Sequence, residues 1–557
     1  MRQGWRGKRF HGGVSFLNPI PPEARPAIKP RIDARRRWLN SGPMQDGIPW
    51  SSDLLTLAQR FGPRSAVTDG TATMTYATLS ARAHGLARRL MAEGFKPGQP
   101  VATFVPNGCD APWVSYGLTM AGVAETPCNT GSTDAELGWF AQLTGFKRIV
   151  ASKVCCARLA GLGFEPLALE DIAPDESGAP LPPVPSDAWG RIIFTSGTTG
   201  KPKAILHSHG GRYLANILQR AVLPFTPEPG ERVLLMTPFT HGAALITYAW
   251  LDHGGEVVLQ DGVRAERIAP VLAAPRLSAI FAPPTVLAKL LALFPGQSVL
   301  GLKVIFCGTQ TLTRDLYARA KAQFGPVVRV TYGMSECFNP ITVLEGADVA
   351  VAMAEDEDGL GANLGWPATG VEIAIRDEAG APLPAGEPGD IWLRARHMNI
   401  GMIGPDGFVP RPAGAWHRTG DLGAVDGRGR LRLAGRASDV MKTGGYRVHP
   451  AEIETTLEPA AQGRAVCVLG LPSEYWGEVI IAVAENLPEG WEHAALPMAE
   501  DLAKHKRPRA WLTLAELPRN AQGKVVRARV RDAVLARWRL EDGPHPRLVP
   551  APAGKDE

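Results

Sequence analysis

Short apolar segments alternate with amphipathic segments along most of this chain, from about residue 51 to residue 436. Residues 101–105 and 257–259 are apolar runs of the kind that forms buried strands. Residues 79–90 carry apolar side chains three and four positions apart with arginines between them, which is typical of a surface helix. Strands and helices that alternate in this way predict an α/β fold.

The chain is longer than one hydrophobic core sustains. It has 557 residues, and cores stop growing at about 250–300 residues, so two or more domains are expected. We expect a large N-terminal α/β domain with several subdomains at residues 44–437 and a small C-terminal α+β domain at residues 438–540. Residues 1–43 are expected to form a basic, disordered arm, and residues 541–557 a disordered tail.

Composition excludes several classes of function. Residues 1–40 contain ten Arg or Lys residues and two acidic residues, which gives them a charge of +8. The net charge of the whole chain is +5, so the remaining residues carry −3. Because this larger part has no basic excess, we predict no nucleic-acid partner. No run reaches the roughly 18 apolar residues of a membrane span. The seven scattered cysteines predict reduced thiols and a cytoplasmic location.

One loop has the chemistry of a polyphosphate site. It runs between two apolar strands and combines glycines, hydroxyls and lysines, which supply close backbone approach, donors and positive charge. It is not a Walker A loop, because Lys201 is followed by Pro202 and Thr195 stands where the first glycine belongs. The candidate ATP-binding residues here are Thr195, Ser196, Gly197, Thr198, Thr199, Gly200, Lys201 and Lys203.

Further motifs follow downstream. They are Tyr332-Gly333-Met334-Ser335-Glu336, Trp416-His417-Arg418-Thr419-Gly420-Asp421, Gly435-Arg436 and Pro518-Arg519-Asn520-Ala521-Gln522-Gly523-Lys524. With the loop, they resemble, in order, the motifs of the adenylate-forming superfamily, and the chain resembles its AMP-dependent acyl-CoA synthetases. This resemblance implies that ATP, Mg²⁺ and coenzyme A are used.

The resemblance also assigns roles to these residues. Tyr332 packs on adenine, Glu336 binds Mg²⁺, Asp421 and Arg436 contact the ribose, and Lys524 is catalytic. The remaining ATP contacts that it implies come from Gly308, Thr309, Gln310, Thr331, Gly333 and Ser335. These roles suit the chemistry, because a carboxylate that attacks an α-phosphate brings two anions together and requires positive charge nearby.

The acid-binding pocket is implied by the same resemblance at His241, Ala244, Gly308, Gly333, Met334 and Phe338. His241 is also assigned to the catalytic group as a gate, with a packing role as the alternative. Residues 237–248 contain no acidic side chain for a substrate ammonium and no Lys or Arg for a second carboxylate. Because an unpaired charge is costly in a desolvated pocket, we expect a mainly apolar monocarboxylic acid, aromatic or medium-chain aliphatic.

In the superfamily the small C-terminal domain is mobile and swings about a hinge between two half-reactions. Ser438 stands at the hinge position, where the family usually has Asp or Lys. Lys442, Gly444 and Gly445 resemble the loop on the thiol side of the site. The expected activity is therefore AMP-forming ligation of an acid to coenzyme A.

Three alternatives stay open. The first is a stand-alone adenylation enzyme that loads the phosphopantetheine of an acyl carrier protein or another nucleophile. The second is a non-catalytic module that binds adenylate or acyl-CoA. The third, an oxygen-dependent luciferase-like activity, has no feature in its favour.

Overall fold

The computed structural model describes residues 47–195, 202–308, 310–355, 361–520 and 523–551. The predicted basic arm, residues 1–43, lies outside this part of the chain. Within the part described, strands and helices alternate as predicted, and the α/β fold class is confirmed.

A seven-stranded sheet lies at the centre of the N-terminal domain, in the order β13-β12-β11-β9-β10-β1-β2. All neighbouring strands are parallel except the pair β1 and β2. The run at residues 257–259 is buried in β10, as predicted. The strands are β1 Ser65–Thr68, β2 Thr73–Thr75, β9 Arg232–Leu235, β10 Glu256–Leu259, β11 Leu277–Phe281, β12 Val304–Cys307 and β13 Val328–Val330.

An eight-stranded sheet forms the second layer, in the order β19-β18-β8-β7-β4-β3-β5-β6. Strands β7, β4, β3, β5 and β6 are parallel, whereas β7, β8, β18 and β19 are antiparallel. The strands are β3 Pro100–Phe104, β4 Ala124–Pro127, β5 Arg148–Ala151, β6 Glu165–Ala168, β7 Trp189–Thr195, β8 Lys203–Ser208, β18 Gly401–Gly404 and β19 Gly407–Pro410.

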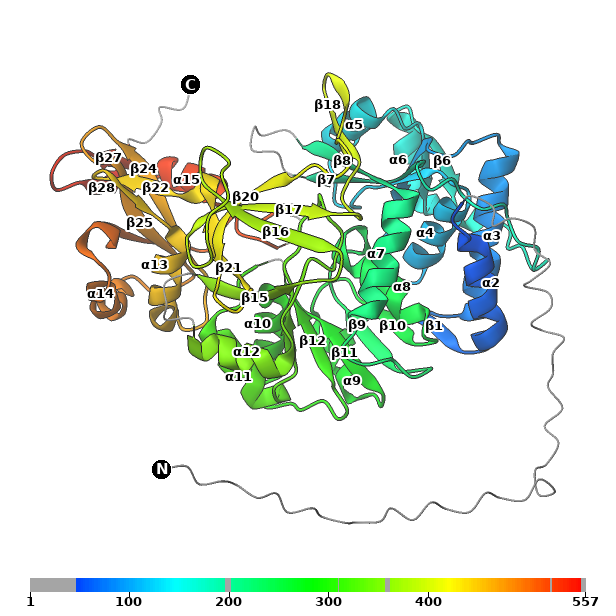
Figure 1. The fold of residues 1–557 in the computed structure, drawn as a ribbon, viewed down its shortest axis with the longest axis horizontal. Coiled ribbons are helices and arrows are strands. Elements are labelled where there is room, and N and C mark those ends of the chain that lie inside the picture. Colours follow the sequence, from blue (N-terminus) through cyan, green and yellow to red (C-terminus); the bar gives the residue numbers. More distant parts are fainter. Residues whose placement is uncertain (1–46, 196–201, 309, 356–360, 521–522, 552–557) are drawn as a thin grey trace, which may run out of the picture. The chain divides into compact units, whose positions relative to one another are not determined.

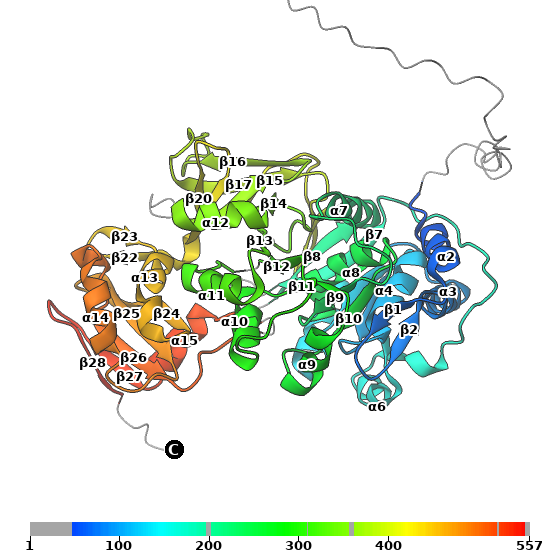
Figure 2. The ribbon, with the colours of Figure 1, turned by 90° about the horizontal axis from the view of Figure 1, so that it is seen from below.

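Helices connect and cover these sheets (Figures 1 and 2). The predicted helix at residues 79–90 is part of α3. Helix α4 packs closely on α3 because Gly117 has no side chain. A Cβ at this position would lie 2.9 Å from the side chain of Leu86. The helices of the N-terminal domain are α2 Trp50–Phe61, α3 Tyr76–Ala92, α4 Asp110–Met120, α5 Asp134–Thr144, α6 Lys153–Gly161, α7 His209–Ala221, α8 Ala244–Leu251, α9 Ala265–Ala273, α10 Pro284–Leu293, α11 Arg314–Phe324 and α12 Gly346–Glu355.

A third, antiparallel sheet of six strands completes the domain, in the order β14-β15-β21-β20-β17-β16. Its strands are β14 Thr342–Val343, β15 Ala362–Pro367, β16 Val371–Arg376, β17 Gly389–Ala395, β20 His417–Val425 and β21 Leu431–Arg436. This sheet carries the predicted ribose-binding residues, Asp421 on β20 and Arg436 at the end of β21.

The C-terminal elements have cores of their own. A five-stranded sheet separates two apolar clusters, one around Ile453 and Ile480 and the other around Leu469 and Val530. The elements are β22 Met441–Thr443, β23 Tyr446–Val448, α13 Pro450–Leu457, β24 Val466–Ser473, β25 Gly477–Glu485, α14 Glu492–Glu500, β26 Ala510–Leu514 and α15 Arg527–Leu535.

The prediction of a disordered tail from residue 541 is wrong as far as residue 551. Strands β27 (Trp538–Glu541) and β28 (Arg547–Pro550) form an antiparallel hairpin, and Leu548 packs on the C-terminal core. The Asp542 carboxylate accepts hydrogen bonds from Ser473 Oγ at 2.6 Å and from the Glu474 backbone N–H at 2.6 Å. Proline content suggested disorder, but these contacts tie the segment to the β24–β25 turn.

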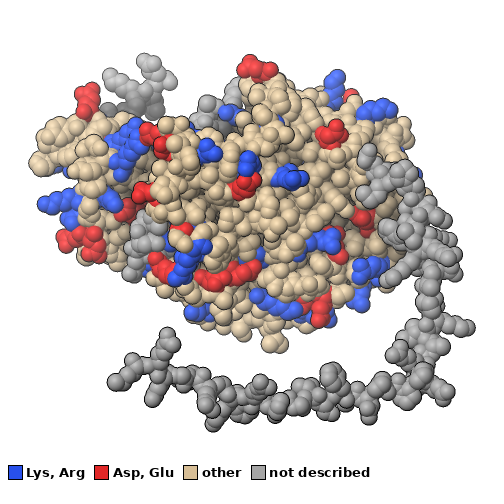
Figure 3. Space-filling model, in the orientation of Figure 1, with Lys and Arg blue, Asp and Glu red and all other residues tan. Residues whose placement is uncertain are grey.

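Three further observations concern the surface charges, the cysteines and the helices. Lys and Arg are interspersed with Asp and Glu on the face drawn in Figure 3. All seven cysteines fall within the described residues and are free thiols. No described helix has the length and apolar character needed to cross a bilayer.

Truncation tests the role of the C-terminal hairpin. We expect a chain that ends at Leu540 to melt a few degrees below the full-length protein, because it loses the packing of Leu548 and the turn contacts of Asp542. A chain that ends at Ala551 is the control and should melt as the full-length protein does. Equal melting temperatures for both truncations, measured by differential scanning fluorimetry, would show that the hairpin contributes no stability.

Candidate active site

The predicted phosphate loop connects two paired strands. Thr195 ends β7 and Lys203 begins β8, and the two residues are partners in the antiparallel register. The residues from Ser196 to Lys201 lie outside the described part of the chain. The register makes β7 and β8 the two strands of an antiparallel hairpin.

A buried ion cluster holds this hairpin in place. The Glu125 carboxylate of β4 accepts from Arg191 Nη1 of β7 at 2.7 Å and lies 2.8 Å from Arg212 Nη1 of α7, and all three side chains are almost fully buried. Burial would raise the pKa of Glu125, but the two guanidinium groups outweigh it and hold the pKa below its usual value. Arg191 Nη2 also donates to the Thr240 carbonyl at 3.0 Å.

The predicted adenine motif joins two sheets. Tyr332 follows β13, and its hydroxyl donates a short hydrogen bond to the Asp421 carboxylate on β20. Burial and the charge of Asp421 raise the pKa of Tyr332, so the phenol stays protonated as the donor. The Tyr332 backbone N–H in turn donates to Thr342 Oγ1 at 3.0 Å. The tyrosine therefore orients the predicted ribose-binding carboxylate.

Charges of both signs gather around this contact. Arg436 is the register partner of Asp421, and its Nε lies 3.5 Å from Asp421 Oδ1. Burial raises the pKa of Glu336, while Arg436 and Arg411 oppose the rise. A bound divalent cation would favour the ionised carboxylate in the same way, so Glu336 fits the predicted Mg²⁺ ligand. The described residues hold no cluster of three metal-ligating side chains, as suits an ion held chiefly by phosphates.

Lys524 reaches this group from the C-terminal domain. Its backbone N–H donates to Asn520 Oδ1 at 2.9 Å and closes the turn that carries it. Burial and the positive charge of Arg436 lower the pKa of Lys524, whereas Asp421 and Asp439 raise it. The structure thus brings the predicted catalytic lysine within electrostatic range of the predicted ribose-binding pair.

The predicted hinge residue lies between the two domains. Ser438 is exposed in a 3₁₀ turn, Ala437–Asp439, and its Oγ donates to Asp439 Oδ1 at 3.1 Å. Asp439 also forms an ion pair of 2.5 Å with Arg527 of α15. The predicted thiol-side residues are found on the β22–β23 hairpin, where Lys442 is exposed and Gly444 and Gly445 have φ of +54° and +83°.

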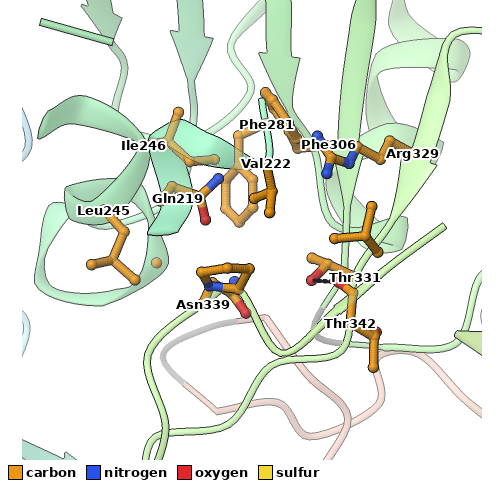
Figure 4. Close-up of a pocket in the computed structure, with 13 residues that line it drawn as sticks. Gln219, Val222, Leu245, Ile246, Phe281, Phe306, Arg329, Thr331, Asn339 and Thr342 are labelled. Carbon is orange, nitrogen blue, oxygen red and sulfur yellow. Dashed lines mark hydrogen bonds between the residues drawn. The ribbon is translucent and has the colours of Figure 1, made fainter. Parts of the chain in front are cut away.

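A cavity lies beside this site, between α7, α8 and the last strands of the parallel sheet (Figure 4). About 430 Å³ of space that no atom occupies lies in and around it, and this figure includes open solvent at its mouth. Its apolar lining comes from Val222, Gly242, Leu245, Ile246, Phe281, Phe306, Pro340 and Val343. Its polar lining comes from Gln219, Arg329, Thr331, Asn339 and Thr342.

This lining differs from the predicted acid pocket. The stretch at residues 237–248 contributes Gly242, Leu245 and Ile246, whereas Ala244, Gly308, Gly333, Met334 and Phe338 are not among the described residues that line the cavity. Phe338 instead packs against Leu245 and stacks on His207, with ring centroids 3.8 Å apart. Ala244 is buried in the main core, Gly308 abuts the Thr331 carbonyl, Gly333 lies against Asn339, and Met334 packs at the edge of a second core cluster. His241 belongs to the π-helical turn Phe239–Ala243.

Four polar residues of the cavity were not predicted from the sequence, namely Gln219, Arg329, Asn339 and Thr342. The one available signal was a charged residue inside an otherwise apolar strand, since Arg329 stands between Val328 and Val330.

A family model described as AMP-binding enzyme matches residues 55–401, which is more than half of the chain.

The chain belongs to the AMP-binding enzyme family.

The relatives of this AMP-binding enzyme are similar along most of its length. A feruloyl-CoA synthase from Amycolatopsis sp is 28% identical over 488 residues, which cover 85% of this chain and 96% of the relative. The structure of ATP-bound MatB from Rhodopseudomonas palustris aligns with a TM-score of 0.71 at 25% identity and covers 87% of this chain and 98% of that one. The structure of o-succinylbenzoate CoA synthetase from Bacillus subtilis, in complex with its acyl-adenylate intermediate, aligns with a TM-score of 0.75 at 24% identity. The alignment covers 87% of this chain and 98% of that one.

These matches confirm the resemblance to AMP-dependent acyl-CoA synthetases that the motifs predicted. They support an enzyme of the acid–thiol ligase class. They also confirm the fold class, a large N-terminal α/β domain with a small C-terminal domain.

Substitution of Tyr332 tests the contact on which the AMP-binding site depends. Tyr332→Phe removes the donor to Asp421 and should raise the KM for ATP about fivefold or more, because a buried carboxylate loses a hydrogen bond. The matched control is Tyr213→Phe, which removes a 2.8 Å hydrogen bond from another tyrosine to Asp53 of α2. The KM for ATP should stay unchanged in this control. An unchanged KM in both variants would remove Tyr332 from nucleotide binding.

Proposed function

We propose that this protein is an AMP-forming carboxylic acid–coenzyme A ligase. In the first step a carboxylate oxygen of the acid attacks the α-phosphorus of ATP, the bond to the bridging oxygen breaks, and pyrophosphate leaves. In the second step the sulfur of coenzyme A attacks the acyl carbon and AMP leaves, while the thiol proton passes to solvent. The products are acyl-CoA, AMP and pyrophosphate.

One observation carries this proposal. Lys524 of the C-terminal domain lies within electrostatic range of Asp421 and Arg436 of the N-terminal domain, and Asp421 accepts a hydrogen bond from Tyr332. An ammonium group in this position neutralises charge as the acid approaches the α-phosphate. Mg²⁺ held by Glu336 would supply further positive charge to the phosphate oxygens.

The arrangement suits the first half-reaction. Asp421 is oriented to accept hydrogen bonds from ribose hydroxyls, and Arg436 is held beside it. Burial and Arg436 lower the pKa of Lys524, and the carboxylates of Asp421 and Asp439 oppose this lowering. For the second step we propose that the C-terminal domain rotates about Ser438, which withdraws Lys524 and brings the Lys442–Gly445 loop to the site.

The alternative acceptor is the phosphopantetheine of a carrier protein. An assay of AMP release separates the two acceptors. Release that depends on free coenzyme A supports the ligase, whereas release that requires a loaded carrier protein contradicts it. The cytoplasmic location stays a prediction.

Removal of Lys524 should separate the half-reactions. Lys524→Ala should slow acid-dependent pyrophosphate release about a hundredfold or more, because the charge that faces the α-phosphate is lost. Thioester formation from a synthetic acyl-adenylate should be largely spared. Lys504→Ala, at an exposed lysine of the same domain, is the control and should behave as the wild type does. Near wild-type pyrophosphate release by Lys524→Ala would exclude this lysine from the mechanism.

The hinge is tested by Ser438→Pro. Proline fixes φ near about −65°, which a 3₁₀ turn tolerates, so the pose that presents Lys524 should persist. Proline also disfavours helical backbone torsions at the preceding residue, Ala437, so we expect a modest loss of pyrophosphate release. Thioester yield should fall at least about tenfold further, because the torsion needed for rotation is blocked.

Ser438→Ala is the control, since it leaves the backbone free, and it should have little effect on either step. Equal losses in both half-reactions of Ser438→Pro would point to misfolding. No loss in either would place the pivot at another residue.

A further inference from the structure

Arg329 brings an unsatisfied polar group to the acid cavity. Its side chain is 4% exposed, and its Nη1 has no hydrogen-bond partner among the described residues. Its Nη2 lies 3.2 Å from Glu345 Oε1. A buried guanidinium nitrogen without a partner is costly to the fold, so its retention in a cavity wall calls for a ligand that satisfies it.

The strand register directs this guanidinium to the cavity. Phe281, Phe306 and Arg329 are successive partners on the parallel strands β11, β12 and β13, so they form one row on one face of the sheet. Side chains alternate along a strand, and Val328 and Val330 pack in the core on the other face. Figure 4 shows the Arg329 side chain beside Phe306, and its guanidinium carbon lies 5.8 Å from the centre of that ring.

The row lies away from the reacting end of the acid. Arg329 precedes Tyr332 by three residues, which is about 10 Å along an extended chain. Thr331, which directly precedes Tyr332, and Arg329 both line the cavity, so an acid that enters it with its carboxylate near Tyr332 would extend along this wall toward Arg329. Gln219 of α7 is buried and adds an amide to the wall of the cavity.

The charges around the cavity favour a neutral group over an anion. Glu345, whose side chain is 43% exposed, already pairs with the guanidinium, so a second carboxylate on the cavity side would bring an excess negative charge against a mainly apolar wall. A hydroxyl or ether oxygen accepts from Nη1 and adds no charge. The apolar lining from Leu245, Ile246, Phe281 and Phe306 suits an aromatic or aliphatic body between the two ends.

We propose that the acid activated by this protein carries a neutral oxygen group, a hydroxyl or an ether, at the end remote from its carboxylate, and that Arg329 selects it. This inference rests on the proposed acid ligase function. It refines the expectation of a mainly apolar acid, because that expectation was based on residues 237–248 alone.

The experiment compares matched acids with the full-length protein. Phenylpropionic acid is assayed beside its para-hydroxy, para-methoxy and para-carboxy derivatives, and octanoic acid beside its ω-hydroxy and ω-carboxy derivatives. Pyrophosphate release gives kcat/KM for each acid. The neutral oxygenated acid of at least one series should exceed its parent about tenfold or more, as expected for a hydrogen bond to a charged group.

Variants then assign this preference to Arg329. Arg329→Met should reduce the preference to about twofold or less and leave the KM for ATP unchanged, while Arg329→Lys keeps a partner for Glu345 if the methionine variant does not fold. The lysine variant should retain part of the preference. Arg158→Met removes an arginine of a surface ion pair on α6 and is the matched control, in which the preference should stay complete.

The other outcomes separate the inference from the function it rests on. A preference for the carboxy derivatives would overturn the neutral-oxygen inference and make Arg329 a site for a second anion. Activity on the parent acids without any preference, or a preference that survives in Arg329→Met, would leave the ligase function standing and overturn the role of Arg329. Absence of pyrophosphate release with every acid would overturn the proposed function and this inference together.

Discussion

The buried carboxylate of Glu125 connects the elements from which the site is built. Through Arg191 it holds β7, which leads into the phosphate loop, and the same guanidinium binds the Thr240 carbonyl in the turn that begins the cavity wall. Through Arg212 it holds α7, which supplies Gln219 to the cavity. Removal of one partner would leave a buried charge uncompensated, which typically costs about 3–5 kcal/mol. The ATP side and the acid side of the site are thus set by one cluster.

Around this cluster the site is assembled from parts that are unrelated in sequence. The parallel sheet delivers Tyr332, the antiparallel sheet delivers Asp421 and Arg436, and the C-terminal domain delivers Lys524. Only the last of these belongs to a domain with a separate core, so it alone can leave without disturbing the others. This arrangement suits the proposed reaction, in which Lys524 leaves the site after the first step and a thiol enters for the second.

The cavity joins residues that are far apart in the sequence. Of the stretch at residues 237–248, Gly242, Leu245 and Ile246 line it, beside residues of α7 and of three parallel strands. Arg329 reaches the cavity because strand register aligns it with Phe306 and Phe281, a relation across strands that are more than twenty residues apart. The tail hairpin was missed for a similar reason, since its contacts are with a turn near Ser473.

Local chemistry in the sequence determined the family and the alternation of strands and helices, and it predicts site roles for Tyr332, Glu336, Asp421, Arg436 and Lys524. These follow from contiguous motifs and from periodicity, which depend on neighbours along the chain. The tertiary structure alone decided which side chains share the cavity, how Tyr332 orients Asp421 and where Arg329 points. The reason is physical: side-chain environment in a sheet is set by partners on adjacent strands, and sequence separation does not encode which strands those are.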